Sequence, residues 1–172
     1  MLVDFVLIVQ RRLDACANRI RENITATGTR ASGRTQASIR VEVSADTGTI
    51  YGRQAFSVLQ TGRRGGRVPR GFVDMMKEWI REKGVRTTPI PYVRRPSAKW
   101  QPKYTPEQRG VNAAAGAIAY KIRTQGTSLY RQGGREDIYT EPIREAVEGV
   151  KADVKAAYVA EIVKDLRRLK DI

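Results

Sequence analysis

Apolar side chains near the start of the chain recur every three or four positions, which is the spacing of one face of an α-helix. This pattern predicts a helix over residues 3–26, and Gly28 is a suitable residue to end it. Most arginines of the segment lie off the apolar face. The positions on that face are Phe5, Val9, Leu13, Cys16, Ile20 and Ile24.

The period then changes to two. Ile39, Val41 and Val43 alternate with polar residues, which is typical of a strand with one buried face. A turn signal at residues 46–48 precedes further β-favouring sequence, so we expect a hairpin of residues 37–44 and 48–53. The segment 55–60 fits either a third strand or a short helix, and its pattern does not separate the two.

Three more helices are predicted further along. One begins at Gly71 and ends near Lys83. The second begins at Thr105-Pro106 with Gln108 as the capping-box partner, and it ends at about Gln125. The third runs from about residue 141 to 170, and we expect its apolar stripe to be buried. That stripe consists of Ile143, Val147, Val150, Val154, Tyr158, Ile162, Leu166 and Leu169.

These elements predict an α+β fold, in which a small antiparallel sheet packs with about four helices, one of them a long C-terminal helix. We divide the chain into a core of residues 1–84, a Pro-rich basic arm of residues 85–106, and a C-terminal helical part, residues 107–172, that packs on the core. The arm carries too many prolines for a helix or a central strand. Residues 61–70 have no periodicity, so we expect a mobile loop there.

The positive charge is concentrated in the middle of the chain. The formal net charge is +14, from 32 Lys+Arg and 18 Asp+Glu, and residues 51–106 alone hold 13 basic and 3 acidic residues. Charge of one sign in irregular sequence is costly unless a polyanion or an acidic partner screens it. We expect the functional contacts there, and the candidate residues are Arg63, Arg64, Arg67, Arg70, Arg94, Arg95, Lys99, Trp100 and Lys103. The alternative is a solvated loop kept soluble by its charge.

Catalytic chemistry has little to build on. The chain has no histidine and one cysteine, so the commonest general base and a Cys/His zinc site are both missing. The Gly-rich segment at residues 62–67 lacks the Gly-Lys-Ser/Thr ending of a phosphate-binding loop. We therefore expect no enzyme activity, no catalytic residues, no metal and no cofactor. The N-terminal apolar run is too short for a membrane span, so we expect a soluble protein without a membrane partner.

The order of the elements resembles a known family. An N-terminal helix is followed by the lead-in Ser32 to Ile39, a small hairpin, the segment Phe56 to Gly62, a variable loop and a helix. This is similar to the tail-completion, or neck, proteins of tailed bacteriophages. In that family the segment corresponding to residues 56–62 closes the sheet and commonly has an acidic residue at the position of Gln60. Residues 79–84 and 126–139 also resemble longer members.

The resemblance implies a virion structural protein, a subunit of a head–tail connector or tail-completion ring that joins the DNA-filled head to the tail. The implied partners are further copies of the chain in an oligomeric ring, the portal or adaptor, tail proteins, and packaged DNA through non-specific contact. The implied location is the neck or tail of the virion, with the host cytoplasm during assembly. Family members carry no catalytic residues or cofactor. The alternative function is a standalone basic nucleic-acid-binding protein.

Overall fold

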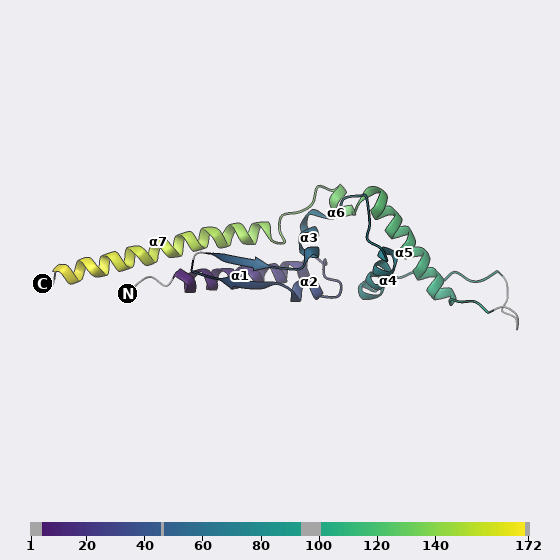
Figure 1. Cartoon of the computed structure of the whole chain (residues 1–172), viewed down its shortest axis with the longest axis horizontal. Helices are drawn as coiled ribbons and strands as arrows, with labels where there is room; N and C mark the ends of the chain where they lie inside the picture. The colour runs from purple at the N-terminus through teal and green to yellow at the C-terminus, as the bar shows by residue number, and fades with distance from the viewer. Residues whose placement is uncertain (1–4, 46, 94–100, 171–172) are drawn as a thin grey trace. The chain divides into compact units, whose positions relative to one another are not determined.

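The computed structural model of the 172-residue chain describes residues 5–45, 47–93 and 101–170. Its elements are seven α-helices, one 3-10 helix and two strands within those residues (Figure 1). They group into two compact units. Unit 1 consists of residues 1–60 and 135–172, and unit 2 consists of residues 61–134. The fold is α+β, as the hydrophobic pattern predicts.

Unit 1 combines a helix pair with a hairpin. Its elements are α1 (Phe5–Ala26), α2 (Arg34–Ala37), β1 (Arg40–Val43), β2 (Gly48–Tyr51), the 3-10 helix η1 (Gln54–Phe56), α3 (Val58–Thr61), which ends at the unit boundary, and α7 (Thr140–Lys170). The strands are antiparallel, with Val41 opposite Ile50. The predicted hairpin is confirmed, with shorter strands. The segment 55–60 is helical, so there is no third strand in this described segment.

The core of unit 1 lies around α1. The buried cluster comprises Cys16, Ala17, Ile20, Ile24, Ile39, Ile138 and Ala146. Every cluster member from α1 except Ala17 is on the predicted apolar face. Burial raises the pKa of the Cys16 thiol, which keeps this side chain neutral in the core. The hairpin lies close on α1, because a Cβ at Gly48 would be 2.7 Å from Val9 Cγ1.

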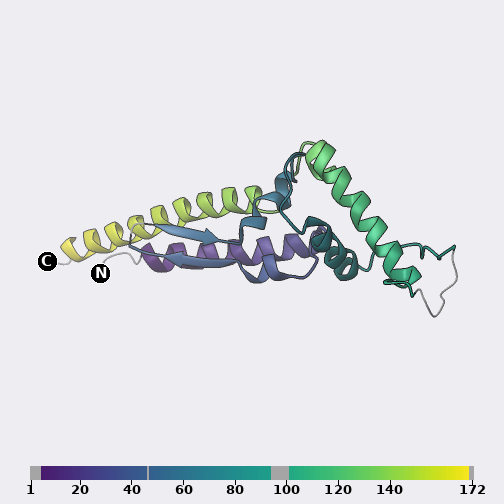
Figure 2. The ribbon, with the colours of Figure 1, turned by 45° about the vertical axis from the view of Figure 1, so that its right-hand side comes forward.

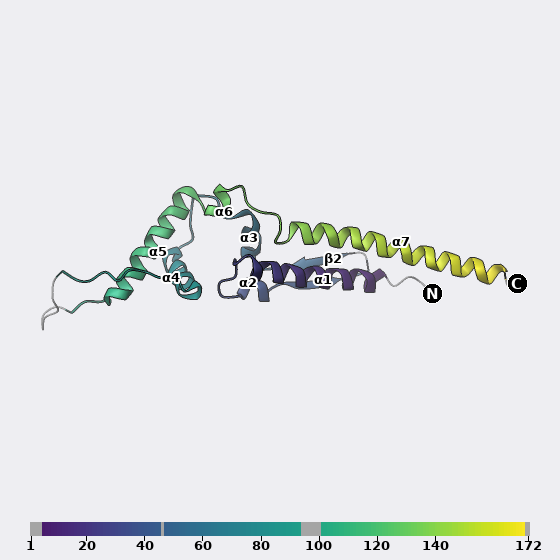
Figure 3. The same ribbon diagram turned by 180° about the vertical axis from the view of Figure 1, so that it is seen from behind.

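Helices α1 and α7 run side by side in opposite directions (Figures 1 and 3). Arg12 bonds to Asp153, and Arg19 pairs with Glu145, so the residue numbers run in opposite senses along the contact. The face of α7 that meets α1 is formed by small residues, with Ala146 buried and Gly149 against the Arg12 guanidinium. The predicted apolar stripe is not that face.

The expectation that the α7 stripe is buried is therefore wrong for most of its length. Val150 and Val154 are half-buried, but Ile162 is 58% exposed and Leu169 is 69% exposed. Sequence periodicity identifies an apolar face without saying what covers it. In α7 small residues allow close approach to α1, and the larger side chains are left outside.

Unit 2 contains α4 (Phe72–Lys83), α5 (Pro106–Gln125) and α6 (Ser128–Arg131), and α4 contacts α5 (Figure 2). Its buried apolar residues are Phe72, Ile80, Ala115 and Ala119. The predicted capping box at the start of α5 is confirmed, because Gln108 N donates to Thr105 Oγ1 and Thr105 N donates to Gln108 Oε1.

The compact units have boundaries different from the sequence-based division into residues 1–84, 85–106 and 107–172. The segment 61–84 groups with the first helix after the arm, and the C-terminal helix groups with the N-terminal one. Of the C-terminal part, residues 135–172, which include α7, belong to unit 1, and residues 107–134 belong to unit 2. The sequence does not show which of the two long helices after the arm packs on the N-terminal helix, because both have equally suitable apolar faces.

Candidate polyanion interface

The two units differ sharply in charge. Unit 2 holds 16 basic and 4 acidic residues, a net charge of +12, whereas unit 1 holds 16 basic and 14 acidic residues, a net charge of +2. Three of the four acidic residues of unit 2 lie on α4, and residues 61–73 and 108–134 contain none. The excess charge predicted for the middle of the chain is thus a property of one compact unit.

The Arg-rich loop, residues 61–71, is held by backbone hydrogen bonds to the end of α5 and the start of α6. Arg63 N donates to Thr127 Oγ1, and Thr127 N donates to Arg63 O, both at 2.9 Å. Gly66 N donates to Arg123 O at 2.7 Å. Main-chain groups and the Thr127 hydroxyl therefore anchor a segment whose sequence pattern gives no sign of anchoring.

Two glycines allow the loop to approach the end of α5 and the start of α6 closely. Gly62 has a φ of 71°, and a Cβ there would overlap the backbone nitrogen of Tyr130. Gly126 has a φ of 79°, and a Cβ there would lie 2.7 Å from Arg63 O. Both positions combine a left-handed backbone with close backbone approach, which only glycine accommodates without strain. The two glycines therefore allow the loop to lie directly against the end of α5 and the start of α6.

Arg63 itself is partly structural. Its guanidinium donates from Nη2 to Arg67 O at 2.9 Å and lies 5.5 Å from the centre of the Phe72 ring. It is half-buried, unlike Arg64, Arg67 and Arg70, which are exposed. Of the four predicted contact residues in this loop, Arg63 therefore shapes the loop, and the other three are exposed on its surface.

The loop brings further cations together. Arg123 at the end of α5 and Arg131 on α6 are exposed and adjoin its anchoring bonds, and Arg131 donates to Gly126 O. We call Arg64, Arg67, Arg70, Arg123 and Arg131 the basic cluster. Within the part of the chain that the structure describes, none of the five forms an ion pair with a carboxylate. Such a cluster attracts phosphates or acidic side chains.

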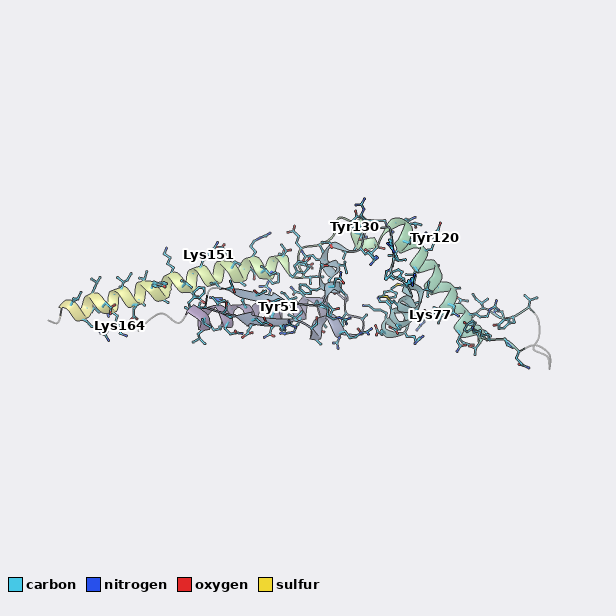
Figure 4. The ribbon with its side chains drawn as sticks, viewed as in Figure 1. Tyr51, Lys77, Tyr120, Tyr130, Lys151 and Lys164 are labelled. Carbon is cyan, nitrogen blue, oxygen red and sulfur yellow. The ribbon has the colours of Figure 1, made fainter. Side chains whose placement is uncertain are left out.

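Periodicity gave no reason to single out Arg123 or Arg131, because both look like ordinary solvated helix residues. A usable signal was the lack of any acidic residue from 108 to 134. An exposed Tyr120 on α5, 70% accessible, lies one turn before Arg123 (Figure 4). Tyr120 and Arg123 also border an open groove with Val68, Pro69 and Phe72.

The other predicted contact residues do not join the cluster in the described structure. Arg94, Arg95, Lys99 and Trp100 lie outside the described residues. Lys103 is exposed, with its Nζ 5.4 Å from the Tyr104 ring centre, and it precedes the start of α5. The Arg-rich loop is anchored at the opposite end of that helix, about 25 Å away at ~1.5 Å per residue.

The described base of the Pro-rich arm is fixed by Arg109, which the sequence pattern did not single out. Its Nη1 donates to Ile90 O at 3.0 Å and to Pro91 O at 2.7 Å, and its guanidinium lies 4.1 Å from the Tyr92 ring centre. Ile90 N also donates to Pro106 O at 2.9 Å. Residues on both sides of the arm are thereby tied to the first turn of α5.

Neither a metal-ligand cluster nor a membrane-spanning helix is found among the described residues. In the described ranges, no three His, Cys, Asp or Glu side chains gather in a way that would hold a metal ion. No described helix combines the length and apolar character needed to cross a membrane.

Comparison of the chain with protein-family models, with curated proteins and with solved structures finds no match. The assignment of function therefore depends on the residues and their arrangement.

Proposed function

We propose that this chain is a structural subunit of a bacteriophage head–tail connector or tail-completion ring. The observation that carries the proposal is the unequal distribution of charge between the two units. One unit is nearly neutral and is built around a long helix, and the other has a net charge of +12 and presents the basic cluster. A subunit that lines or borders a DNA passage needs one part for assembly and one part compatible with a polyanion.

Gln60 is compatible with the proposal, although its segment is helical and does not close the sheet as the family segment does. It is 4% exposed, and its Oε1 accepts hydrogen bonds from Tyr139 N at 2.9 Å and Thr140 N at 3.2 Å, at the start of α7. The phage family commonly has an acidic residue at this position, and a carboxylate would accept the same two bonds. Gln60 can therefore accept the same two hydrogen bonds as the acidic residue that is common at this position in the family.

The proposed partners follow from the same assignment. They are other copies of the chain in a ring, the portal or adaptor, and tail proteins, with the basic cluster near packaged DNA or an acidic protein surface. The proposed location is the neck or tail of the virion, and the host cytoplasm during assembly. In this role the protein acts by positioning surfaces, so neither enzyme activity nor a cofactor is part of the proposal.

A second function, a standalone nucleic-acid-binding protein, is favoured by the basic cluster alone. Two measurements separate the candidates. Removal of the gene from a phage that encodes it should leave DNA-filled heads and separate tails in electron micrographs, and expression in trans should restore joined particles. Normal particles without the protein, together with steeply salt-dependent DNA binding by the purified chain, would instead support the second function.

A further inference from the structure

Helix α7 presents an apolar stripe that the described residues of unit 1 leave largely exposed. Six of its side chains are at least two-fifths exposed, namely Ile143 40%, Val147 45%, Tyr158 55%, Ile162 58%, Leu166 60% and Leu169 69%. Val150 and Val154 continue the stripe and are half-buried. The last part of α7 extends past the first turn of α1 (Figures 1 and 3), so α1 leaves it uncovered.

We propose that this stripe binds the same stripe on a second copy of the chain, with the two α7 helices antiparallel. The order of the apolar residues is the first reason. Measured from Ala156, apolar residues lie two positions away on both sides (Val154 and Tyr158), six away (Val150 and Ile162), and thirteen away (Ile143 and Leu169).

A twofold axis at the height of Ala156 would therefore place each of these residues level with an apolar residue of the partner. Val147 and Leu166 miss the same relation by one position, so Val147 is level with Asp165 and Leu166 is level with Ala146. A symmetric dimer requires this self-complementarity, because one patch must serve both subunits. In a helix without such symmetry, apolar residues would face charged ones along part of the contact.

Charge selects the antiparallel arrangement over the parallel one. Under the same twofold axis, Glu145 is level with Arg167, Glu148 with Lys164, and Lys151 with Glu161. Within one chain Glu145 also pairs with Arg19, and Lys151 with Glu148. Arg144 and Arg168 are a level pair of like sign, and so are Glu141 and Asp171 in the sequence. In a parallel, in-register pair every charged residue would be level with its own copy, and all would repel. Lys151 and Lys164 both project from α7 into solvent (Figure 4).

The exposed area suits a small but specific interface. A fully exposed apolar side chain of this size presents roughly 100 Å², so eight that are about half exposed present ~400 Å². Homodimer interfaces are about 65% apolar, so the whole contact would bury about 600 Å² per partner. That is near the ~1,200 Å² total at which specific interfaces begin. We therefore expect a dimer that dissociates on dilution.

This inference concerns the free chain in solution and does not depend on the proposed connector role. The test is sedimentation velocity of the full chain over a concentration series. Ile162→Glu should weaken dimerisation at least tenfold. Ala160→Glu adds the same charge at an exposed α7 position outside the stripe, so it should dimerise like the parent. Circular dichroism melts of both variants should match the parent, since both sites are exposed.

The antiparallel register has its own test. Val150→Cys protein mixed with Ile162→Cys protein should form a mixed disulfide dimer under mild oxidation, and the Val150→Cys protein alone should form much less. The native Cys16 is buried and stays out of the reaction. A parent chain that is monomeric at all concentrations, a dimer indifferent to Ile162→Glu, or preferential Val150→Cys self-cross-linking would each overturn the proposal.

Discussion

Arg12 of α1 and Asp153 of α7 form a two-bonded ion pair, in which Nε donates to Oδ2 and Nη2 donates to Oδ1, both at 2.7 Å. Arg11 adds a weaker contact to Oδ2 at 3.3 Å. The pair joins residues 141 positions apart and fixes the register of the two long helices of unit 1. Its planar geometry matches the guanidinium to the carboxylate, which Lys could not reproduce.

The Arg12–Asp153 pair should make stability depend on pH. The hydrogen bonds and charge of Arg12 hold the pKa of Asp153 below its ordinary value of 3.8. A carboxyl with a lowered folded-state pKa contributes stability above its unfolded pKa, and this is lost as the pH falls through the folded one. The melting temperature of Asp153→Asn should therefore lie below that of the parent at pH 7.

The melting temperatures of Asp153→Asn and of the parent should converge as the pH is lowered through 3.8 and further. Asp165→Asn is a matched control, because Asp165 is exposed and its contact with Arg168 is a long one of 3.7 Å within the same helix. Its melting temperature should follow the parent at every pH. A constant deficit for Asp153→Asn across the whole range would show that the substitution acts through packing and not through charge.

Gln60 should be intolerant of an apolar replacement. Its buried side chain accepts from Tyr139 N and Thr140 N, and its Nε2 donates to Thr140 Oγ1 at 2.5 Å. Gln60→Leu leaves these groups at the start of α7 without partners, and each buried unsatisfied group costs about 1–3 kcal/mol. Urea unfolding should show a loss in that range or above. Gln60→Glu keeps the acceptor and should lose clearly less; equal losses for the two would refute the capping role.

Two glycines in α5 should respond to alanine with opposite signs. A Cβ at Gly110 would overlap the carbonyl oxygen of Thr88, whereas a Cβ at Gly116 meets nothing within 4 Å. Replacement of Gly by Ala inside a helix usually stabilises by roughly 0.5–1 kcal/mol. Gly116→Ala should show that gain in urea unfolding. Gly110→Ala should destabilise instead, because the backbone at the base of the arm must move. A gain at both sites would show that this base is not docked on α5.

The sequence predicted the types of the helices and strands well, but it predicted poorly which of them pack on one another. The α1 face and the α5 capping box could be predicted because both depend on nearby residues. The α7 contact could not, since Ala146 and Gly149 carry no apolar signal as strong as that of Ile162. The roles of Gln60, Arg109 and Arg123 depend on residues distant in the sequence. For the Arg-rich loop, charge was readable from composition, whereas its anchoring through Thr127 required the fold.

The roles of the two faces of α7 in folding can be distinguished by one substitution on each face. Ala146 is 8% exposed against α1, and Ile162 is 58% exposed. Ala146→Asp puts an unpaired charge into the core of unit 1, which should cost on the order of 3 kcal/mol or more. Ile162→Asp should leave the melting temperature within a few degrees of the parent at dilute concentration. If Ile162→Asp were the more damaging change, the stripe would be covered within the single chain.

The basic cluster should act in binding and not in folding. Arg64, Arg67 and Arg70 are exposed and have no carboxylate partner among the described residues, so their replacement by Ser should leave the melting temperature nearly unchanged. Arg63 is kept, because it bonds to Arg67 O and stacks on Phe72. Each phosphate that a cation neutralises adds about 0.9 to the steepness of log affinity against log salt, so the triple variant should reduce that steepness by up to ~2.7.

The matched control for the triple variant carries Ser at Arg30, Arg34 and Arg53, three exposed arginines of unit 1 with the same formal charge change. It should keep the parental salt slope for duplex DNA. In a phage that encodes the protein, the loop variant should give unjoined heads and tails or heads that lose DNA, and the control should give joined particles. Parental particle yield from the loop variant, with an unchanged salt slope, would leave the basic cluster as a solvated surface.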